Sequence, residues 1–218
     1  MDFTYRKNIN DDYNLKNLSI CLDLINKKNI KKIGSGGQGE IYKVFSPKCG
    51  SAVIKIRITK VSQKVSQKLS LIEELQIEYK IMLLTNRMIK QFICPNFIIT
   101  YNFNEKNKYL VMEYADGDTE ILFKNTYYDE NIYKSYICQV LLGLYAFNNY
   151  TMLYHRDLRP ANILYKKISE NIIFHYKINN KDYYVPTYGF LFMICDYGQA
   201  THIVLKNVYL TLFILIFP

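Results

Sequence analysis

The chain alternates between strand-like and helix-like hydrophobic patterns. Four runs in its first half are rich in Ile, Val, Phe and Tyr and are bounded by Gly, Pro, Ser and Asn. They are residues 30–45, 51–58, 96–103 and 108–115. This pattern predicts β-strands joined by turns, and the last two runs predict a hairpin. From 69 to 88 the apolar residues instead recur at three- and four-residue spacing, which predicts an α-helix.

The second half of the chain is predicted to contain a longer helix and a polar loop, residues 154–165. The apolar stripe of the helix consists of Tyr133, Ile137, Val140, Leu141 and Leu144. Residues 171–178 and 189–198 are strand-like, and a short amphipathic helix is predicted within residues 1–29 from the spacing of its leucines. Strands come first and helices second, so the order predicts an α+β fold in which a small β-rich lobe precedes a helical one.

Composition adds few constraints to this picture. The chain has 218 residues, 50% of them hydrophobic and 22% charged, which allows a sizeable core. The net charge is +9, but the lysines are scattered among acidic residues instead of forming a stripe with aromatic residues. We therefore expect a solvated basic surface and no specific nucleic-acid partner.

The cysteines and the two ends of the chain bear on its location. The five cysteines include no C-x-x-C pair, so neither a zinc site nor a disulfide framework is predicted. The charged start lacks the apolar core of a signal peptide, and both features favour a cytoplasmic protein. Residues 208–218 are almost wholly apolar but shorter than the ~20 residues that span a bilayer, so no transmembrane anchor is predicted.

Three glycines form a G-x-G-x-x-G motif within the first predicted strand run. They are Gly34, Gly36 and Gly39. Glycines let backbone N–H groups approach a phosphate closely. A dinucleotide-binding fold would continue with a helix, whereas here a β run follows, which favours a flexible lid over a nucleotide. A plain glycine-rich hairpin turn is the alternative, because this motif is common by chance.

A lysine on the next predicted strand is a second candidate for binding phosphate. Lys55 is flanked by apolar residues, and burial of its charge requires partners such as phosphate oxygens and a carboxylate. The predicted helix offers Glu73, Glu74 and Glu78. Glu78 falls on the apolar face and is preferred, with Glu74 as the alternative.

The polar loop carries the pattern H-R-D-x-x-x-x-N. In it, Asp157 can accept a hydroxyl proton, and the side-chain oxygen of Asn162 can bind a hard cation. Asp196 follows a predicted strand and precedes a glycine, which suits a second Mg²⁺ ligand. Phosphoryl transfer depends on positioning and charge neutralisation, and these residues can supply both.

In this order, the motifs resemble those of the protein kinase family. The resembling stretch runs from about residue 30 to 201, with "GSGGQGEI", "AVIK", "YLVMEYA", "HRDLRPAN" and "DYG" as its motifs. The resemblance implies a two-lobed kinase-like fold, ATP and Mg²⁺ as cofactors, and a protein substrate with a Ser or Thr acceptor.

The resemblance also implies roles for further residues. The nucleotide would be bound by Ile33, Gly34, Ser35, Gly36, Gly37, Gln38, Gly39, Glu40, Ile41, Ala52, Lys55, Met112, Glu113, Ala115 and Leu164. Met112 would be the gatekeeper, and Ile41, Ala52 and Leu164 would enclose the adenine. Lys55, Glu78, Asp157 and Arg159 would act in catalysis, with Asn162 and Asp196 holding the metal. Met82, His155 and Tyr197 would form part of the spine that links the lobes.

The sequence departs from the family pattern in several places. Arg159 replaces the usual lysine, although Pro160 still favours the Ser/Thr type. The 34 residues from Asn162 to Asp196 exceed the usual hairpin there and predict a loop insertion, part of which is similar to kinase-like proteins of large DNA viruses. Tyr197 replaces the usual Phe, so its hydroxyl needs a partner.

The largest departure is that only 22 residues follow Asp196 and contain no A-P-E element. We therefore expect an N-terminal extension (1–29), a kinase N-lobe (30–114), a partial C-lobe (115–201) and an atypical apolar tail (202–218). Two alternatives stay open: a nucleotide-binding fragment or pseudokinase, and a small-molecule kinase. A partner chain that completes the C-lobe is a further expectation.

Overall fold

A computed structural model describes residues 30–36, 39–46, 50–56, 71–104, 109–125 and 127–202. The predicted amphipathic helix before residue 30 and the apolar tail beyond residue 202 lie outside this part of the chain. Among the described residues, no helix is long and apolar enough to cross a membrane.

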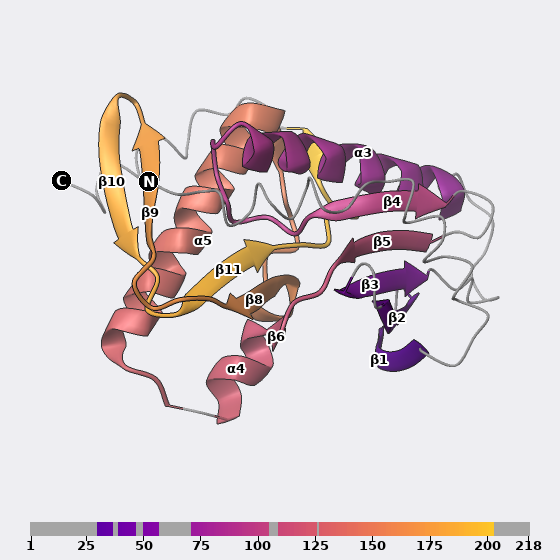
Figure 1. Cartoon of the computed structure of the whole chain (residues 1–218). Coiled ribbons are helices and arrows are strands. Elements are labelled where there is room, and N and C mark those ends of the chain that lie inside the picture. Colours follow the sequence, from indigo (N-terminus) through magenta and orange to yellow (C-terminus); the bar gives the residue numbers. More distant parts are fainter. Residues whose placement is uncertain are drawn as a thin grey trace.

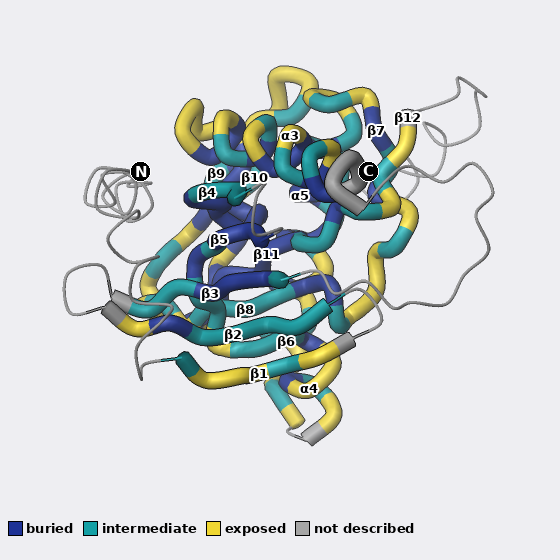
Figure 2. Tube along the Cα trace, turned by 90° about the vertical axis from the view of Figure 1, so that its right-hand side faces the viewer, coloured by how far each residue is buried: buried dark blue, intermediate teal, exposed yellow. Residues whose placement is uncertain are grey.

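The first half of the chain forms an antiparallel five-stranded sheet with the order β1-β2-β3-β5-β4 (Figure 1). Its strands are β1 (Ile30–Gly36), β2 (Gly39–Ser46), β3 (Gly50–Ile56), β4 (Thr100–Asn104) and β5 (Tyr109–Glu113). The predicted hairpin of the last two runs is confirmed, because β4 pairs with β5. β1 lies exposed at one edge of the sheet, and β5 is largely buried (Figure 2).

Helix α3 (Leu71–Lys90) lies along β4 and confirms the predicted helix to within a few residues. Its inward face is apolar at Leu75 and Met82, both completely buried. Glu78 lies one turn after Leu75 and is also buried. The α3 helix therefore presents a carboxylate to the core, as its spacing predicted.

The second half packs two more helices on a small sheet. Helix α5 (Glu130–Thr151) lies against β11 (Phe190–Ile194), and β11 pairs with β8 (Ile163–Lys167). The remaining elements are β6 (Gly117–Asp118), α4 (Thr119–Asn125), β7 (Leu153–Tyr154), the short 3-10 helix η2 (Pro160–Asn162) and β12 (Thr201–His202). This arrangement confirms the predicted β-rich lobe followed by a lobe built around a long helix.

The predicted insertion is largely a β-hairpin and not a loop, and its first strand confirms the strand-like run predicted at 171–178. β9 (Ile173–Ile178) and β10 (Lys181–Pro186) pair in antiparallel register across the two residues Asn179 and Asn180. Both turn residues have positive φ, 49° and 63°, as a two-residue hairpin turn of the primed type requires, and asparagine tolerates this conformation. The hairpin stands beside α5 (Figure 1).

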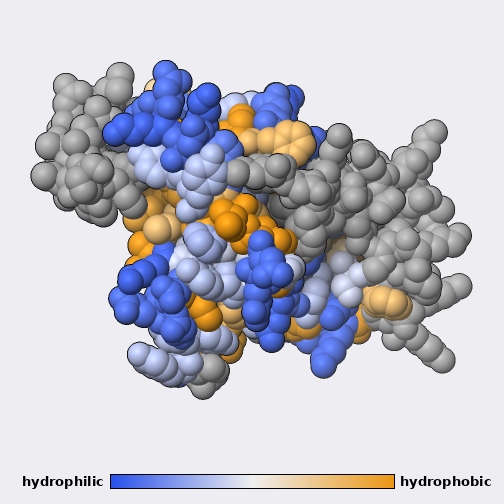
Figure 3. Space-filling view, turned by 60° about the vertical axis from the view of Figure 1, so that its left-hand side comes forward, coloured by the Kyte–Doolittle hydropathy of each residue, from blue (hydrophilic) through white to orange (hydrophobic). Residues whose placement is uncertain are grey.

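The hairpin contributes one face to the main core. Phe174, Tyr176 and Val185 are buried in the same cluster as Leu75 and Met82. The opposite face is exposed, with Ile173 at 51% and Tyr184 at 57% exposure. On the side of the molecule shown in Figure 3, apolar side chains gather between hydrophilic ones.

The predicted apolar stripe of α5 is partly wrong. Ile137 is 52% exposed, and Tyr133 and Leu141 are only half-buried. The helix instead buries Ser135 and Gln139 together with Val140 and Leu142. The two polar side chains are buried because they form hydrogen bonds inside the molecule, described below.

Candidate active site

The glycine-rich motif lies on the β1–β2 hairpin. Gly34 pairs with Ile41, Ser35 with Glu40 and Gly36 with Gly39, while Gly37 and Gln38 between them lie outside the described residues. A Cβ at Gly34 would approach Ile41 no closer than 3.8 Å, an ordinary contact. Packing within the described protein therefore does not require glycine at this position.

Two neighbours of the glycines are placed by the same hairpin. Ile33 is exposed, and the Glu40 carboxylate is held by the Lys32 ammonium group and the Tyr42 hydroxyl. The Glu40 side chain is thus engaged on the hairpin itself.

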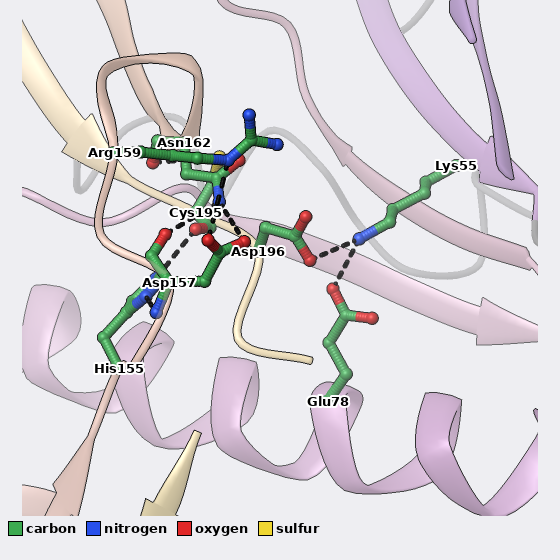
Figure 4. A network of polar contacts seen from close by, with 8 residues as sticks. All are labelled: Lys55, Glu78, His155, Asp157, Arg159, Asn162, Cys195 and Asp196. Atoms are coloured by element: carbon green, nitrogen blue, oxygen red, sulfur yellow. Dashed lines mark hydrogen bonds and ion pairs between the residues drawn. The ribbon is translucent and has the colours of Figure 1, made fainter. Parts of the chain in front are cut away.

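Lys55 lies between two carboxylates (Figure 4). Its Nζ is 2.8 Å from Glu78 Oε1 on α3 and 2.9 Å from Asp196 Oδ1, which follows β11. Burial alone lowers the pKa of Lys55, but the charges of Glu78 and Asp196 outweigh burial and raise the pKa above its ordinary value. Lys55 therefore remains a cation and joins the five-stranded sheet, α3 and the segment after β11.

The preference for Glu78 over Glu74 agrees with this geometry. Glu73 and Glu74 belong to the first turn of α3, where the side chains are outside the described residues. Glu78 is 1% exposed and reaches Lys55 directly.

The polar loop brings Asp157 and Asn162 together. The Asn162 amide nitrogen donates to the backbone oxygen and to Oδ2 of Asp157, at 2.9 Å in both cases. Asn162 is 4% exposed, and its backbone oxygen accepts from the Cys195 N–H at 3.0 Å. Since the amide nitrogen is used in holding Asp157, the amide oxygen is the atom that Asn162 offers to a ligand.

Arg159 is near Asp157 but is loosely placed. Its Nε lies 3.6 Å from Asp157 Oδ1, and its side chain is 58% exposed. An exposed pair at this distance contributes little to stability, so the guanidinium group remains available to a substrate.

His155 and Cys195 connect the polar loop to the segment that carries Asp196. His155 Nδ1 accepts from the Asp157 N–H at 3.3 Å, and Nε2 lies 2.9 Å from the Cys195 backbone oxygen. This arrangement assigns the ring proton to Nε2, which donates to Cys195. Burial lowers the pKa of His155, so the ring is neutral at pH 7.

Cys195 was not predicted as a site residue. Its N–H and thiol both donate to the Asn162 backbone oxygen, the thiol at 3.3 Å, and its own oxygen accepts from His155. Burial raises the pKa of the Cys195 thiol to about 12, so it remains protonated. The only signal in the sequence was its position directly before Asp196.

The ring of Tyr197 stacks on Phe147 with centroids 5.2 Å apart and lies the same distance from His155. Its hydroxyl, which needed a partner, donates to the Ile194 oxygen at 3.0 Å. Met82, His155 and Tyr197 are all buried. These contacts tie the segment after β11 to the polar loop and to α5.

Backbone geometry around the site is unusual at two residues. Arg156 and Asp196 have φ values of 63° and 65°. Non-glycine residues in this region cost on the order of 1 kcal/mol or more and are concentrated at functional sites. The hydrogen bonds of His155, Asn162 and Cys195 hold this conformation.

The segment in which Glu113 and Ala115 are predicted to bind the nucleotide begins at the last residue of β5. Glu113 N donates to the Ile99 oxygen and Glu113 Oε1 accepts from the Ile99 N–H, so Glu113 is fixed on both sides. Lys166 lies 3.7 Å from its other carboxylate oxygen. The apolar residues assigned to the adenine are partly buried and are Ile41, Ala52, Met112, Ala115 and Leu164.

The structure thus brings Lys55, Glu78, Asp157, Asn162 and Asp196 to one place. Comparison with known proteins supports the resulting interpretation: the sequence profile of the protein kinase domain matches residues 27–214. The chain belongs to the protein kinase family.

Individual relatives agree with this assignment. Calcium-dependent protein kinase 5 of Plasmodium falciparum is 34% identical over 145 residues, covering 64% of this chain and 23% of that protein. Serine/threonine-protein kinase greatwall of Danio rerio is 31% identical over 138 residues, covering 62% and 15%. A probable serine/threonine-protein kinase of Invertebrate iridescent virus 6 is 26% identical over 201 residues, covering 79% and 36%. The matched region is therefore about a third or less of each relative, and the comparisons give no support for a partner chain.

The residues present fit the ATP and Mg²⁺ that this family generally uses. No group of three or more His, Cys, Asp or Glu side chains that could hold a metal occurs in the described part of the chain. Mg²⁺ beside a nucleotide does not need such a group, because it is bound by one or two carboxylates together with phosphate oxygens and water. Asp196 and the amide oxygen of Asn162 are donors of this type.

Proposed function

We propose that this kinase transfers the γ-phosphoryl group of ATP to Ser or Thr hydroxyls of proteins. In this proposal Asp157 accepts the proton of the substrate hydroxyl, and Lys55 and the β1–β2 hairpin hold the phosphates. Asn162 and Asp196 hold Mg²⁺, which neutralises the charge that develops on the phosphates.

The observation that carries the proposal is the contact of Lys55 with Glu78 and Asp196. A lysine that is 8% exposed and paired with two carboxylates is a fixed cation, and its position on β3 beside Asp196 suits phosphate oxygens next to a metal. Phosphoryl transfer requires this kind of preorganised charge more than it requires covalent chemistry.

The proposed Ser/Thr specificity is supported by the polar loop and by relatives. Pro160 after Arg159 resembles the Ser/Thr type, and two of the relatives described above carry that specificity in their names. Arg159 is exposed beside Asp157, where its guanidinium group can bind the transferred phosphate in a two-pronged geometry that lysine lacks.

We further propose that residues 30–114 form the N-lobe and that residues 115–201 form part of the C-lobe, with Glu113 and Ala115 bonding the adenine through their backbone. A cytoplasmic setting, where ATP is abundant and cysteines stay reduced, is the location we propose.

The decisive experiment is transfer of labelled γ-phosphate from Mg·ATP by the 218-residue chain to a Ser/Thr-rich acceptor protein. The matched control is Asp157→Asn, which keeps the size of the side chain and removes the proton acceptor. Transfer by the wild type and not by the variant supports the proposal, and phosphoamino-acid analysis identifies the acceptor. Nucleotide binding by folded protein without transfer would instead indicate a nucleotide-binding pseudokinase, and transfer to a sugar or amino alcohol alone would indicate a small-molecule kinase.

A further inference from the structure

Among the described residues, the strand that delivers Asp196 has an edge with no neighbouring strand, apart from an isolated β-bridge between Phe97 and Ile194. β11 pairs with β8 on one side, and on the other side the backbone groups of Phe190, Phe192 and Ile194 point away from β8. Buried backbone groups need hydrogen-bond partners. Two side-chain amides bond three of these six groups, and the backbones of Thr187, Asn96 and Ile98 bond the other three.

Gln139 of α5 bonds the first part of this edge as a neighbouring strand would. Its Nε2 donates to the Phe190 oxygen, and its Oε1 accepts from the Phe192 N–H, both at 3.0 Å. Asn96, in the segment between α3 and β4, bonds the next part. Its Nδ2 donates to the Phe192 oxygen at 2.8 Å, and its backbone oxygen accepts from the Ile194 N–H at 2.9 Å.

The two amides also bond each other, and Asn96 packs closely against α5. Asn96 Nδ2 donates to Gln139 Oε1 at 3.0 Å. A Cβ at Gly143 of α5 would lie 3.1 Å from Asn96 Cβ and 3.2 Å from Ile194 Cδ1, so glycine allows this close approach. Asn96 and Gln139 are both 0% exposed, and we call them the amide pair.

The β9–β10 hairpin fixes the orientation of both amides. The Tyr176 hydroxyl of β9 donates to Asn96 Oδ1 at 2.6 Å. Ser135 accepts from Gln139 Nε2 at 3.0 Å and donates to the Pro186 oxygen at the end of β10, at 2.7 Å. Burial raises the pKa of Tyr176 well above its ordinary value, so the hydroxyl keeps its proton and acts as a donor.

The Asn96 amide has one favourable orientation, in which its nitrogen meets the Phe192 oxygen and its oxygen accepts from Tyr176. With the amide turned over, the NH₂ group would face the Tyr176 hydroxyl and the oxygen would face the Phe192 oxygen, leaving two acceptors opposed in a buried site. Among the described residues, the other donor to Asn96 Oδ1 is the Cys94 thiol at 3.5 Å, and a thiol is a weak donor.

We propose that the β9–β10 hairpin is a positioning element for phosphoryl transfer, in which Tyr176 and Ser135 orient the amide pair that holds β11, and with it Asp196, in place. The side-chain amides bond this edge as far as Phe192, and the Asn96 backbone oxygen then bonds Ile194, two residues before Asp196. The inference rests on the proposed function, since it assigns to Asp196 the binding of Mg²⁺. Tyr176, Ser135, Asn96 and Gln139 are positioning residues in this scheme, because they act through β11.

The test is Tyr176→Phe, which removes one hydroxyl and keeps the buried ring. The matched control is Tyr184→Phe, which removes a hydroxyl from the exposed face of the same hairpin while its ring remains stacked on His175. For Tyr176→Phe we expect kcat to fall by about tenfold and the Mg²⁺ concentration for half-maximal transfer to rise, since a loss near 1.4 kcal/mol is tenfold in rate. The KM for the acceptor protein should be unchanged. Tyr184→Phe should match the wild type.

A purely structural role of Tyr176 would lower stability without changing kcat or the Mg²⁺ concentration for half-maximal transfer. Native-state hydrogen exchange provides a readout that needs no activity: the Phe192 and Ile194 amides should exchange faster in Tyr176→Phe than in Tyr184→Phe, relative to amides of α3. Ser135→Ala is a second, independent variant with the same expected direction if Tyr176→Phe does not fold. Unchanged exchange at Phe192 and Ile194 in a folded variant overturns the inference, whether or not the wild type transfers phosphate. Absence of transfer by a wild type whose variants do show faster exchange contradicts the proposed function alone.

Discussion

At the residue scale, the site depends on one buried lysine. Lys55 is buried, so its ammonium group depends on Glu78 and Asp196 for compensation. The two carboxylates come from segments far apart in the sequence. If only one of them were present, the ammonium group of Lys55 could take a different position. Their joint action is what fixes the position of Nζ.

Glu78→Gln should therefore lower kcat by about tenfold or more, because the amide can still accept a hydrogen bond but no longer balances the charge of Lys55. The KM for ATP should change less than kcat. Glu74→Gln is the matched control, since Glu74 was the alternative partner from the sequence. Steady-state kinetics of both variants at saturating Mg·ATP would check this, and an equal loss in the Glu74 variant would contradict the assignment.

The buried His155 ring predicts a dependence of stability on pH. Its pKa is lowered in the folded state, so the unfolded chain takes up the proton first as the pH falls. The contribution of His155 is complete above its ordinary pKa of 6.5 and is lost as the pH falls from there through the folded-state pKa. Between these limits the free energy of unfolding should fall with decreasing pH.

Urea denaturation of wild type and His155→Phe between pH 5 and 8 measures this dependence. The variant should be less stable overall, because the Cys195 oxygen loses its donor, but its free energy of unfolding should vary less with pH. Equal slopes for the two proteins would show that other groups cause the dependence.

At the scale of elements, the β9–β10 hairpin is part of the core. Phe174 is 7% exposed and lies on its inner face, next in sequence to the exposed Ile173. The hairpin should therefore behave as a structural element of the lobe, although the sequence predicted only its first strand and placed it in a loop insertion.

Phe174→Ala should lower the free energy of unfolding by about 3–5 kcal/mol, the usual cost of removing a buried aromatic ring. Ile173→Ala, one residue earlier, should change it by roughly 0.5 kcal/mol or less, as is usual for surface positions. Chemical denaturation of the two variants gives the comparison. Similar small values for both would mean that the hairpin contributes little to the core.

The sequence predicted α3, β4 and β5 well because each has a local signal, and the roles of the site residues stay predictions. Leu75, Glu78 and Met82 share a helix face, and the kinase motifs have fixed internal spacing. The polar side of α5 could not be predicted in this way. Ser135 and Gln139 are buried because the edge of β11 needs hydrogen-bond partners, and that need exists only once distant segments meet. The β9–β10 hairpin did leave a signal, the Asn179–Asn180 pair, which favours a two-residue turn.

Over the whole molecule, the site joins the five-stranded sheet to the second half of the chain. Lys55 and Glu78 come from the first half, whereas Asp157, Asn162 and Asp196 come from the second (Figure 4). A ligand that contacts both halves should stabilise the fold as a unit.

We expect Mg·ATP at 100 times its dissociation constant to raise the free energy of unfolding by about 2.7 kcal/mol. Chelation of Mg²⁺ should remove most of this gain, and Asp196→Asn should reduce it while leaving the Mg²⁺-free nucleotide effect nearly unchanged. Thermal unfolding with and without EDTA checks both expectations. A gain that does not depend on Mg²⁺ would contradict the assignment of Asp196 to the metal.

The amide pair on β11 has one more consequence, which concerns solubility. The strand reads Phe-Leu-Phe-Met-Ile, without a charge or a proline, and such segments tend to pair with copies of themselves when an edge is open. Proteins commonly protect such an edge with another strand, a lysine or a bulge. Here the side chains of Asn96 and Gln139 and the backbone beside Ile194 occupy it, so the same contacts that hold Asp196 also prevent an aggregation-prone strand from adding to its neighbours.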